Sequence, residues 1–107
     1  MTVRTISPVE LKRLMAQSKA VTLLDVRRAD EFATAAIGGA INISIDDLPY
    51  SYDDVPRDQM IVTICHHGVR SARAADFLQE QGFANVFSLE GGIDAWALQV
   101  DKTVPRY

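Results

Sequence analysis

One cysteine, Cys65, stands where a strand pattern meets a helix pattern in this chain of 107 residues. A short apolar run at 61–64 leads into it, a loop containing 66–68 follows, and a helical pattern begins at Ser71. Open α/β sheets bind ligands at the carboxyl ends of their strands. A helix start favours an anion, and the thiolate is the reactive form of cysteine. The pattern therefore predicts a nucleophilic cysteine.

A lone cysteine is more often a small buried hydrophobe, and this is the alternative interpretation of Cys65. Its neighbours argue against it, because His66, His67 and Gly68 do not continue the apolar run. Arg70 follows closely, and a nearby cation stabilises a thiolate. We therefore predict that Cys65 is the catalytic residue.

The charged and aromatic residues of the predicted active-site loop each have two interpretations. Arg70 either binds an anionic substrate and stabilises the thiolate, or is a surface arginine at a helix start, where the dipole does not favour its charge. His66 and His67 either donate hydrogen bonds to a substrate or are exposed loop residues. Neither histidine is expected to bind a metal.

Small residues complete the loop. Gly68 supplies the backbone freedom that a tight curl needs, and Val69 lies beside it. Ser71 is expected to be the N-cap of the following helix, with the alternative that its hydroxyl faces the sulfur.

Two further polar residues follow an earlier strand. Asp25 and Arg27 would share the sheet edge of Cys65 if the sheet is parallel, and could support the pocket. The structural alternative is that Asp25 bonds neighbouring loops while Arg27 pairs with Glu31.

Composition limits the class of protein. Its 48% hydrophobic and 23% charged residues are typical of an ordinary globular chain, long enough for one core. A net charge of −3 argues against general nucleic-acid binding, and no apolar run approaches the ~20 residues that span a bilayer. There is no secretion signal pattern, no second cysteine and no zinc-site spacing. We expect a single-domain cytoplasmic protein with no membrane segment, metal or other cofactor.

Strand and helix patterns alternate along the chain. Strands are expected at 21–24, 40–43, 61–64 and 85–88, and helices from Ser7 with a Glu10 capping box, at about 30–36, near 46–48, at 71–81 and after Gly91-Gly92. The alternation predicts an α/β fold with a central parallel sheet of about five strands and helices on both faces. The single domain comprises residues 1–107, with a core of about 5–100 and a surface tail at 101–107.

Three motifs in this order resemble the rhodanese homology domain family over about residues 5–100. They are Leu24-Asp25-Val26-Arg27 with Glu31-Phe32 and 39–43, the loop from Cys65 to Arg70 with Ser71, and Leu89 to Trp96. One stretch departs from the family pattern of Gly-His-Ile-Pro-Gly-Ala. Here Ala36 and Gly38 replace the usual His and Pro, which we interpret as structural drift outside the loop.

The resemblance implies a sulfurtransferase that carries sulfane sulfur as a persulfide on Cys65. The thiolate would attack the outer sulfur of a donor such as thiosulfate and release sulfite, and loop N–H groups would hold the anionic persulfide. Because the chain has no second cysteine, the sulfur must pass to an outside acceptor. Cyanide serves in the test tube, and a thiol or a protein is expected in the cell.

Two other functions stay open at this point. One is a non-catalytic binding or regulatory module, although inactive members of the family usually lack the cysteine. The other is a small cysteine phosphatase or arsenate reductase. Phosphatases of this kind have five residues between cysteine and arginine, whereas four separate Cys65 from Arg70, as in sulfur-transferring members.

Overall fold

The computed structural model describes residues 3–17 and 20–107. Within these ranges, five parallel strands form one sheet in the spatial order β1-β5-β4-β2-β3. The strands are β1 (Arg4–Ile6), β2 (Val21–Asp25), β3 (Ile41–Asn42), β4 (Met60–Ile64) and β5 (Val86–Leu89). The helices are α1 (Pro8–Ala16), α2 (Ala29–Thr34), α3 (Leu48–Ser51), α4 (Val69–Glu80) and α5 (Gly92–Gln99), with a 3-10 turn η1 (Tyr52–Asp54). The predicted α/β class and five-stranded parallel sheet are confirmed.

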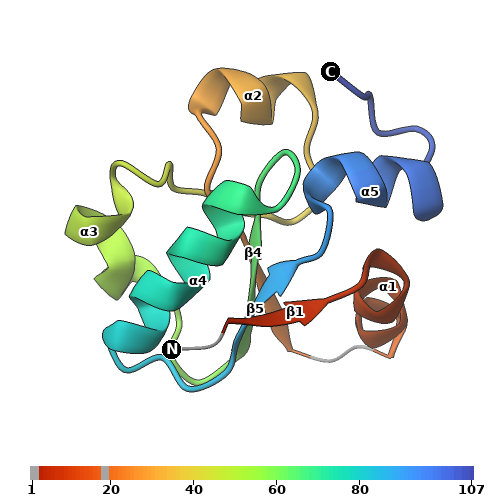
Figure 1. Ribbon diagram of the computed structural model, residues 1–107. Coiled ribbons are helices and arrows are strands. Elements are labelled where there is room, and N and C mark those ends of the chain that lie inside the picture. Colours follow the sequence, from red (N-terminus) through yellow and green to blue (C-terminus); the bar gives the residue numbers. More distant parts are fainter. Residues whose placement is uncertain (1–2, 18–19) are drawn as a thin grey trace.

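Helices cover both faces of the sheet. Figure 1 shows α1 and α5 on one face and α3 and α4 on the other. Side chains alternate along the central strand β4, as the pleat requires. Ile61 packs in the cluster beneath α3 and α4, whereas Val62 and Ile64 pack against α1 and α5. Cys65 continues the alternation and joins the α4 side.

The sheet has a topological switch between β2 and β4. The chain leaves β2 toward β3 and leaves β4 toward β5, in opposite directions across the sheet. Asp25 pairs in register with Ile64, so the residues that follow these two strands meet at one edge. As predicted, Asp25 and Arg27 lie on the sheet edge of Cys65. This is where open α/β sheets form their binding crevice.

Strand β1 and the start of helix α4 are the differences from the sequence-based expectation that bear on the site. Strand β1 was not expected, because Arg4 and Thr5 are exposed and only Ile6 is buried, which leaves no apolar run to recognise. Helix α4 begins at Val69 rather than at Ser71. Gly68 adopts φ 109° and takes the N-cap position, so the predicted N-cap role of Ser71 is wrong.

The first helix begins as expected, with one exception. The Ser7 hydroxyl accepts a hydrogen bond from the Glu10 N–H at 3.1 Å, and Pro8 occupies the first turn. The Glu10 carboxylate pairs with Arg13 instead of closing a capping box. No helix of the described residues is both long and apolar enough to cross a membrane.

Candidate active site

The Cys65 thiol lies inside its own loop. The residue directly follows β4 and is only 1% exposed. Its Sγ atom accepts a hydrogen bond from the Gly68 N–H at 3.0 Å and lies 3.5 Å from the Ser71 hydroxyl. A donor aimed at sulfur stabilises the thiolate more than the thiol. The loop is therefore built to hold negative charge at this atom.

Gly68 makes the curl of this loop possible. Its left-handed backbone, φ 109°, turns the chain back toward the sulfur and starts α4 in the same step. In the described part of the chain, the N–H groups of Val69 and Arg70 find no protein acceptor. A helix start with free N–H groups next to a thiol is suited to an anion.

The loop also rests on the start of helix α5. The Ile93 N–H donates to the Cys65 carbonyl at 2.8 Å, and the Asp94 N–H donates to the His66 carbonyl at 3.2 Å. This contact requires a glycine at 92. A Cβ atom on Gly92 would lie 2.4 Å from the His66 carbonyl oxygen and 2.5 Å from that of Cys65. The second glycine of the Gly91-Gly92 pair thus permits close backbone approach as well as a turn.

Buried hydroxyls support the thiol from the α4 side of the sheet. The Ser71 hydroxyl lies 2.7 Å from that of Ser88 and donates to the Gly68 carbonyl at 3.2 Å. The Thr63 hydroxyl donates to the Ser71 carbonyl at 2.8 Å. The alternative interpretation of Ser71, with its hydroxyl facing the sulfur, agrees with this geometry at 3.5 Å from Cys65 Sγ.

Arg70 is held by a carboxylate from helix α2. Its Nη1 and Nη2 atoms donate to Glu31 Oε1 at 2.6 Å and Oε2 at 2.9 Å. Glu31 is buried, and the Arg70 guanidinium holds the pKa of that carboxyl well below its usual range. Sequence reasoning missed this pair, because nothing local links residues that lie 39 positions apart.

Asp25 and Arg27 form a second, fully buried ion pair. Arg27 Nε donates to Asp25 Oδ1 at 2.8 Å, and Arg27 Nη2 donates to the Ala35 carbonyl at 2.6 Å. The expected pairing of Arg27 with the Glu31 carboxylate is wrong, since Arg27 meets only the Glu31 carbonyl, at 3.2 Å. The Glu31 carboxylate is taken by Arg70, which leaves Arg27 to neutralise Asp25.

The last residue of the chain reaches this site. The Tyr107 hydroxyl donates to Glu31 Oε2 at 2.8 Å and accepts from Arg27 Nη1 at 3.0 Å. Within the tail at 101–107, Val104 is buried and most of the other residues, Tyr107 included, are exposed. A tyrosine in a polar tail carries no periodic signal, and sequence reasoning did not find it.

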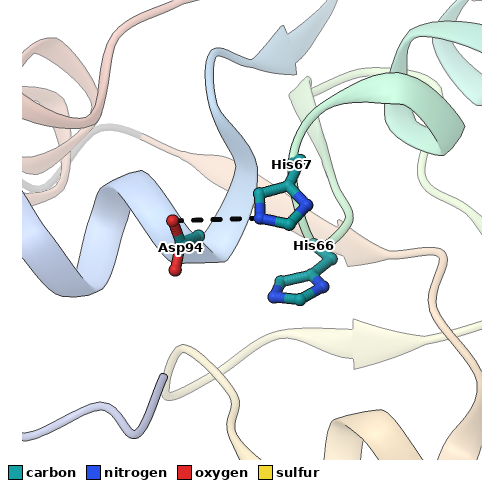
Figure 2. A group of neighbouring side chains, drawn as sticks. All are labelled: His66, His67 and Asp94. Atoms are coloured by element: carbon teal, nitrogen blue, oxygen red, sulfur yellow. Dashed lines mark ion pairs between the residues drawn. The ribbon is translucent and has the colours of Figure 1, made fainter. Parts of the chain in front are cut away.

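The two loop histidines stack on one another beside Asp94 (Figure 2). Their ring centroids are 3.9 Å apart, and His67 Nε2 lies 3.9 Å from Asp94 Oδ2. One potential ligand atom from each of the three residues falls within 4.8 Å of the others. Arg106 already binds Asp94 at 2.8 Å and lowers the pKa of that carboxyl.

The loop histidines differ in exposure. His67 is 64% exposed, whereas His66 is half-buried and its Nε2 atom has no partner among the described residues. Both sit directly after the thiol, and the His66 carbonyl is tied to α5. The site thus combines a buried cysteine, a loop N–H group that donates to its sulfur and two neutralised ion pairs.

This arrangement defines a single-domain α/β protein whose cysteine loop is suited to covalent transfer of an anionic group. The sequence model of the rhodanese-like domain family matches residues 7–99, and the chain belongs to that family.

Curated relatives carry sulfurtransferase names. The thiosulfate sulfurtransferase GlpE of Shewanella oneidensis is 38% identical over 82 residues, 77% of this chain and 81% of the relative. A sulfurtransferase of Allochromatium vinosum is 34% identical over 89% of both chains. These names support a transferase of the sulfurtransferase kind.

A solved structure agrees in fold. The rhodanese-like domain protein of Staphylococcus aureus superposes with a TM-score of 0.85 at 30% identity, covering 98% of this chain and 99% of that chain. The expected family and fold are both confirmed.

Proposed function

We propose that the protein is a thiosulfate sulfurtransferase that carries sulfur as a persulfide on Cys65. The observation that carries this proposal is the 3.0 Å contact from the Gly68 N–H to Cys65 Sγ, inside a loop with free helix-start N–H groups. A persulfide anion needs such donors as much as a thiolate does. The thiosulfate sulfurtransferase name of the Shewanella relative supports the choice of donor.

In the first step, the Cys65 thiolate attacks the outer sulfur of thiosulfate. The new S–S bond joins Cys65 Sγ to that sulfur, and the sulfur–sulfur bond of thiosulfate breaks to release sulfite. Charge is conserved, because a thiolate and a dianion give a persulfide anion and sulfite. The loop N–H groups around Sγ stabilise the charge that arrives on the terminal sulfur.

In the second step, an outside nucleophile attacks the terminal sulfur and Cys65 leaves as a thiolate. The acceptor is cyanide in the assay and a thiol or a protein in the cell. The single cysteine supports an outside acceptor, because no second thiol exists to resolve the persulfide. We propose a cytoplasmic location, where thiols stay reduced, and no cofactor is needed for either step.

The remaining site residues position the loop. The Ser71 hydroxyl contacts the sulfur of Cys65, and the ion pair with Glu31 holds Arg70 at the end of the loop. The buried pair of Asp25 and Arg27 fixes the neighbouring strand end. We propose positioning roles for Asp25, Arg27 and Arg70, rather than direct substrate contact.

The geometry disfavours phosphate as the transferred group. A phosphate clamp uses the paired Nη atoms of an arginine fork, and Glu31 occupies both Nη atoms of Arg70. The loop also has four residues between Cys65 and Arg70, which suits a smaller group. The intact cysteine and loop favour turnover over a purely binding module.

Steady-state formation of thiocyanate from thiosulfate and cyanide tests the proposal. Wild type should form thiocyanate, Cys65→Ser should form none, and an aryl phosphate should not be hydrolysed. A matched control is Arg13→Gln, on an exposed residue of α1 outside the cysteine loop, which should form thiocyanate at the wild-type rate. Thiocyanate formation by Cys65→Ser equal to wild type would overturn the assignment, as would aryl phosphate hydrolysis in place of sulfur transfer.

A further inference from the structure

A cavity of about 300 Å³ with three arginines in its wall lies beside the cysteine loop. Its lining is Val26, Arg28, Ser44, Ile45, Asp46, Arg70 and Arg73. These residues come from the ends of β2 and β3 and from the first turns of α4. The mechanism above uses none of this space.

Two contacts place the cavity against the site. The Val26 N–H donates at 2.9 Å to the carbonyl of Ile64, the residue before Cys65, and Val26 and Cys65 share one packed cluster. Arg70 closes the cysteine loop and lines the cavity as well. A molecule in the cavity would therefore lie next to Arg70, the residue that closes the cysteine loop.

Two of the three arginines in the cavity wall are already paired with carboxylates, and the third is not. Arg70 is bound to Glu31, and Arg28 pairs with exposed Asp30 at 3.0 Å. Arg73 has no carboxylate partner within the described ranges. Asp46 is the acidic residue in the lining, and Arg73 is the lining arginine whose charge no described carboxylate pairs with.

We infer that this cavity binds the carboxylate of a small anionic thiol, the acceptor that discharges the Cys65 persulfide. The inference rests on the proposed sulfurtransferase function. Arginine forks bind carboxylates with paired hydrogen bonds, and Arg73 has its fork free of any described acid. At ~30 Å³ per water, the cavity holds about ten waters, more than a five-atom thiosulfate ion requires. Its volume reaches the lower limit of small-molecule sites, at about 300 Å³.

The transfer step balances without a further reactant. The acceptor thiolate attacks the terminal sulfur of the persulfide, and a new S–S bond forms on the acceptor. The bond from Cys65 Sγ to that sulfur breaks, and Cys65 returns to the thiolate. The acceptor leaves as a persulfide anion, so total charge and oxidation level are unchanged.

A pair of thiols that differ only in charge tests the inference. The acceptors are 3-mercaptopropionate and its neutral amide, 3-mercaptopropionamide. For each thiol, kcat/KM is measured for discharge of the Cys65 persulfide. Wild type should favour the carboxylate, and Arg73→Gln should reduce that preference about two- to fivefold, as for one partly exposed ion pair. The rates with the amide and with cyanide should not change.

Arg13→Gln is the matched control. It removes the same charge from an exposed arginine on α1, which covers the face of the sheet opposite α4 (Figure 1). An unchanged preference in Arg73→Gln, or an equal loss in Arg13→Gln, would overturn the inference. Equal use of the two thiols by wild type would also overturn it. Cyanide turnover in the same samples keeps these results separate from failure of the sulfurtransferase proposal.

Discussion

Tyr107 lies flat against His66, with ring centroids 4.0 Å apart and an interplanar angle of 8°. Its hydroxyl donates to Glu31, which in turn holds Arg70 through both carboxylate oxygens. The tail therefore contacts the start of the cysteine loop directly and the end of that loop through one intermediate. Tyr107 is a positioning residue in this account, because it touches the loop but not the sulfur.

Replacing Tyr107 should loosen the loop. Tyr107→Ala loses the ring stack and both hydrogen bonds, with an expected cost of about 1–3 kcal/mol in unfolding free energy. Tyr107→Phe keeps the stack on His66 and should cost less. Alkylation of Cys65 by iodoacetamide should be fastest in Tyr107→Ala, since the buried thiol becomes more accessible. Wild-type alkylation rates in Tyr107→Ala would show that the tail does not order the loop.

The Glu31–Arg70 pair predicts how stability depends on pH. Because Arg70 depresses the pKa of Glu31 in the folded state, the unfolded chain takes up this proton first as the pH falls. The stabilisation is complete above the ordinary glutamate pKa of ~4.3 and is lost as the pH falls below it. Urea unfolding of wild type and Glu31→Gln from pH 7 to pH 3 measures this. The difference in unfolding free energy between wild type and Glu31→Gln should shrink as the pH decreases.

A control separates that pair from general acid sensitivity. Glu90 is exposed and forms no ion pair among the described residues, so Glu90→Gln should follow the wild-type curve. A constant gap between wild type and Glu31→Gln at every pH would contradict the ion-pair explanation.

A side chain at position 92 should separate the loop from α5. Gly92→Ala adds a Cβ atom 2.4 Å from the His66 carbonyl, on a backbone with φ +64°. Gly39→Ala is the matched control, since Gly39 has φ +87° but no atom within 4 Å of the added carbon. Backbone strain alone costs about 1–3 kcal/mol in stability. Gly92→Ala should therefore lose more stability than Gly39→Ala, and it should also lose sulfur transfer. Thermal unfolding and the thiocyanate assay measure these two effects. Equal results for Gly92→Ala and Gly39→Ala would refute the close-contact role of Gly92.

The two buried serines should have separable effects. Ser71→Ala removes the hydroxyl 3.5 Å from Cys65 Sγ, whereas Ser88→Ala removes only the partner of Ser71, 2.7 Å away. Both leave one hydroxyl with fewer partners, at a cost of about 1–3 kcal/mol. Stopped-flow loading with thiosulfate should be slower in Ser71→Ala, about two- to tenfold, and close to wild type in Ser88→Ala. Identical loading rates in all three proteins would exclude a role for Ser71 at the sulfur.

Local patterns were sufficient to predict the fold class and the position of Cys65. The apolar run before Cys65 is the central strand β4, and the glycine at 68 does turn the chain into α4. The start of α4 was misplaced because a glycine N-cap offers no capping side chain to recognise. These features depend on neighbours in sequence, which is why sequence reasoning reaches most of them.

Contacts across the fold could not be predicted in this way. Glu31 and Arg70 are 39 residues apart, and Tyr107 is 76 residues from Glu31. The predicted pairing of Arg27 with Glu31 was wrong because Arg70 takes the Glu31 carboxylate, and Arg27 binds Asp25 instead. Partner choice among charges requires the packed structure, because each ion pair depends on the others.

The central claim is that Cys65 carries one sulfur atom between donor and acceptor. The most direct measurement is the intact mass of the reduced protein after thiosulfate, before and after cyanide, beside Cys65→Ser. Wild type should gain the mass of one sulfur atom and lose it to cyanide, and Cys65→Ser should gain nothing. A wild-type protein that gains no sulfur while Cys65 still alkylates would contradict it, as would a gain of sulfur by Cys65→Ser.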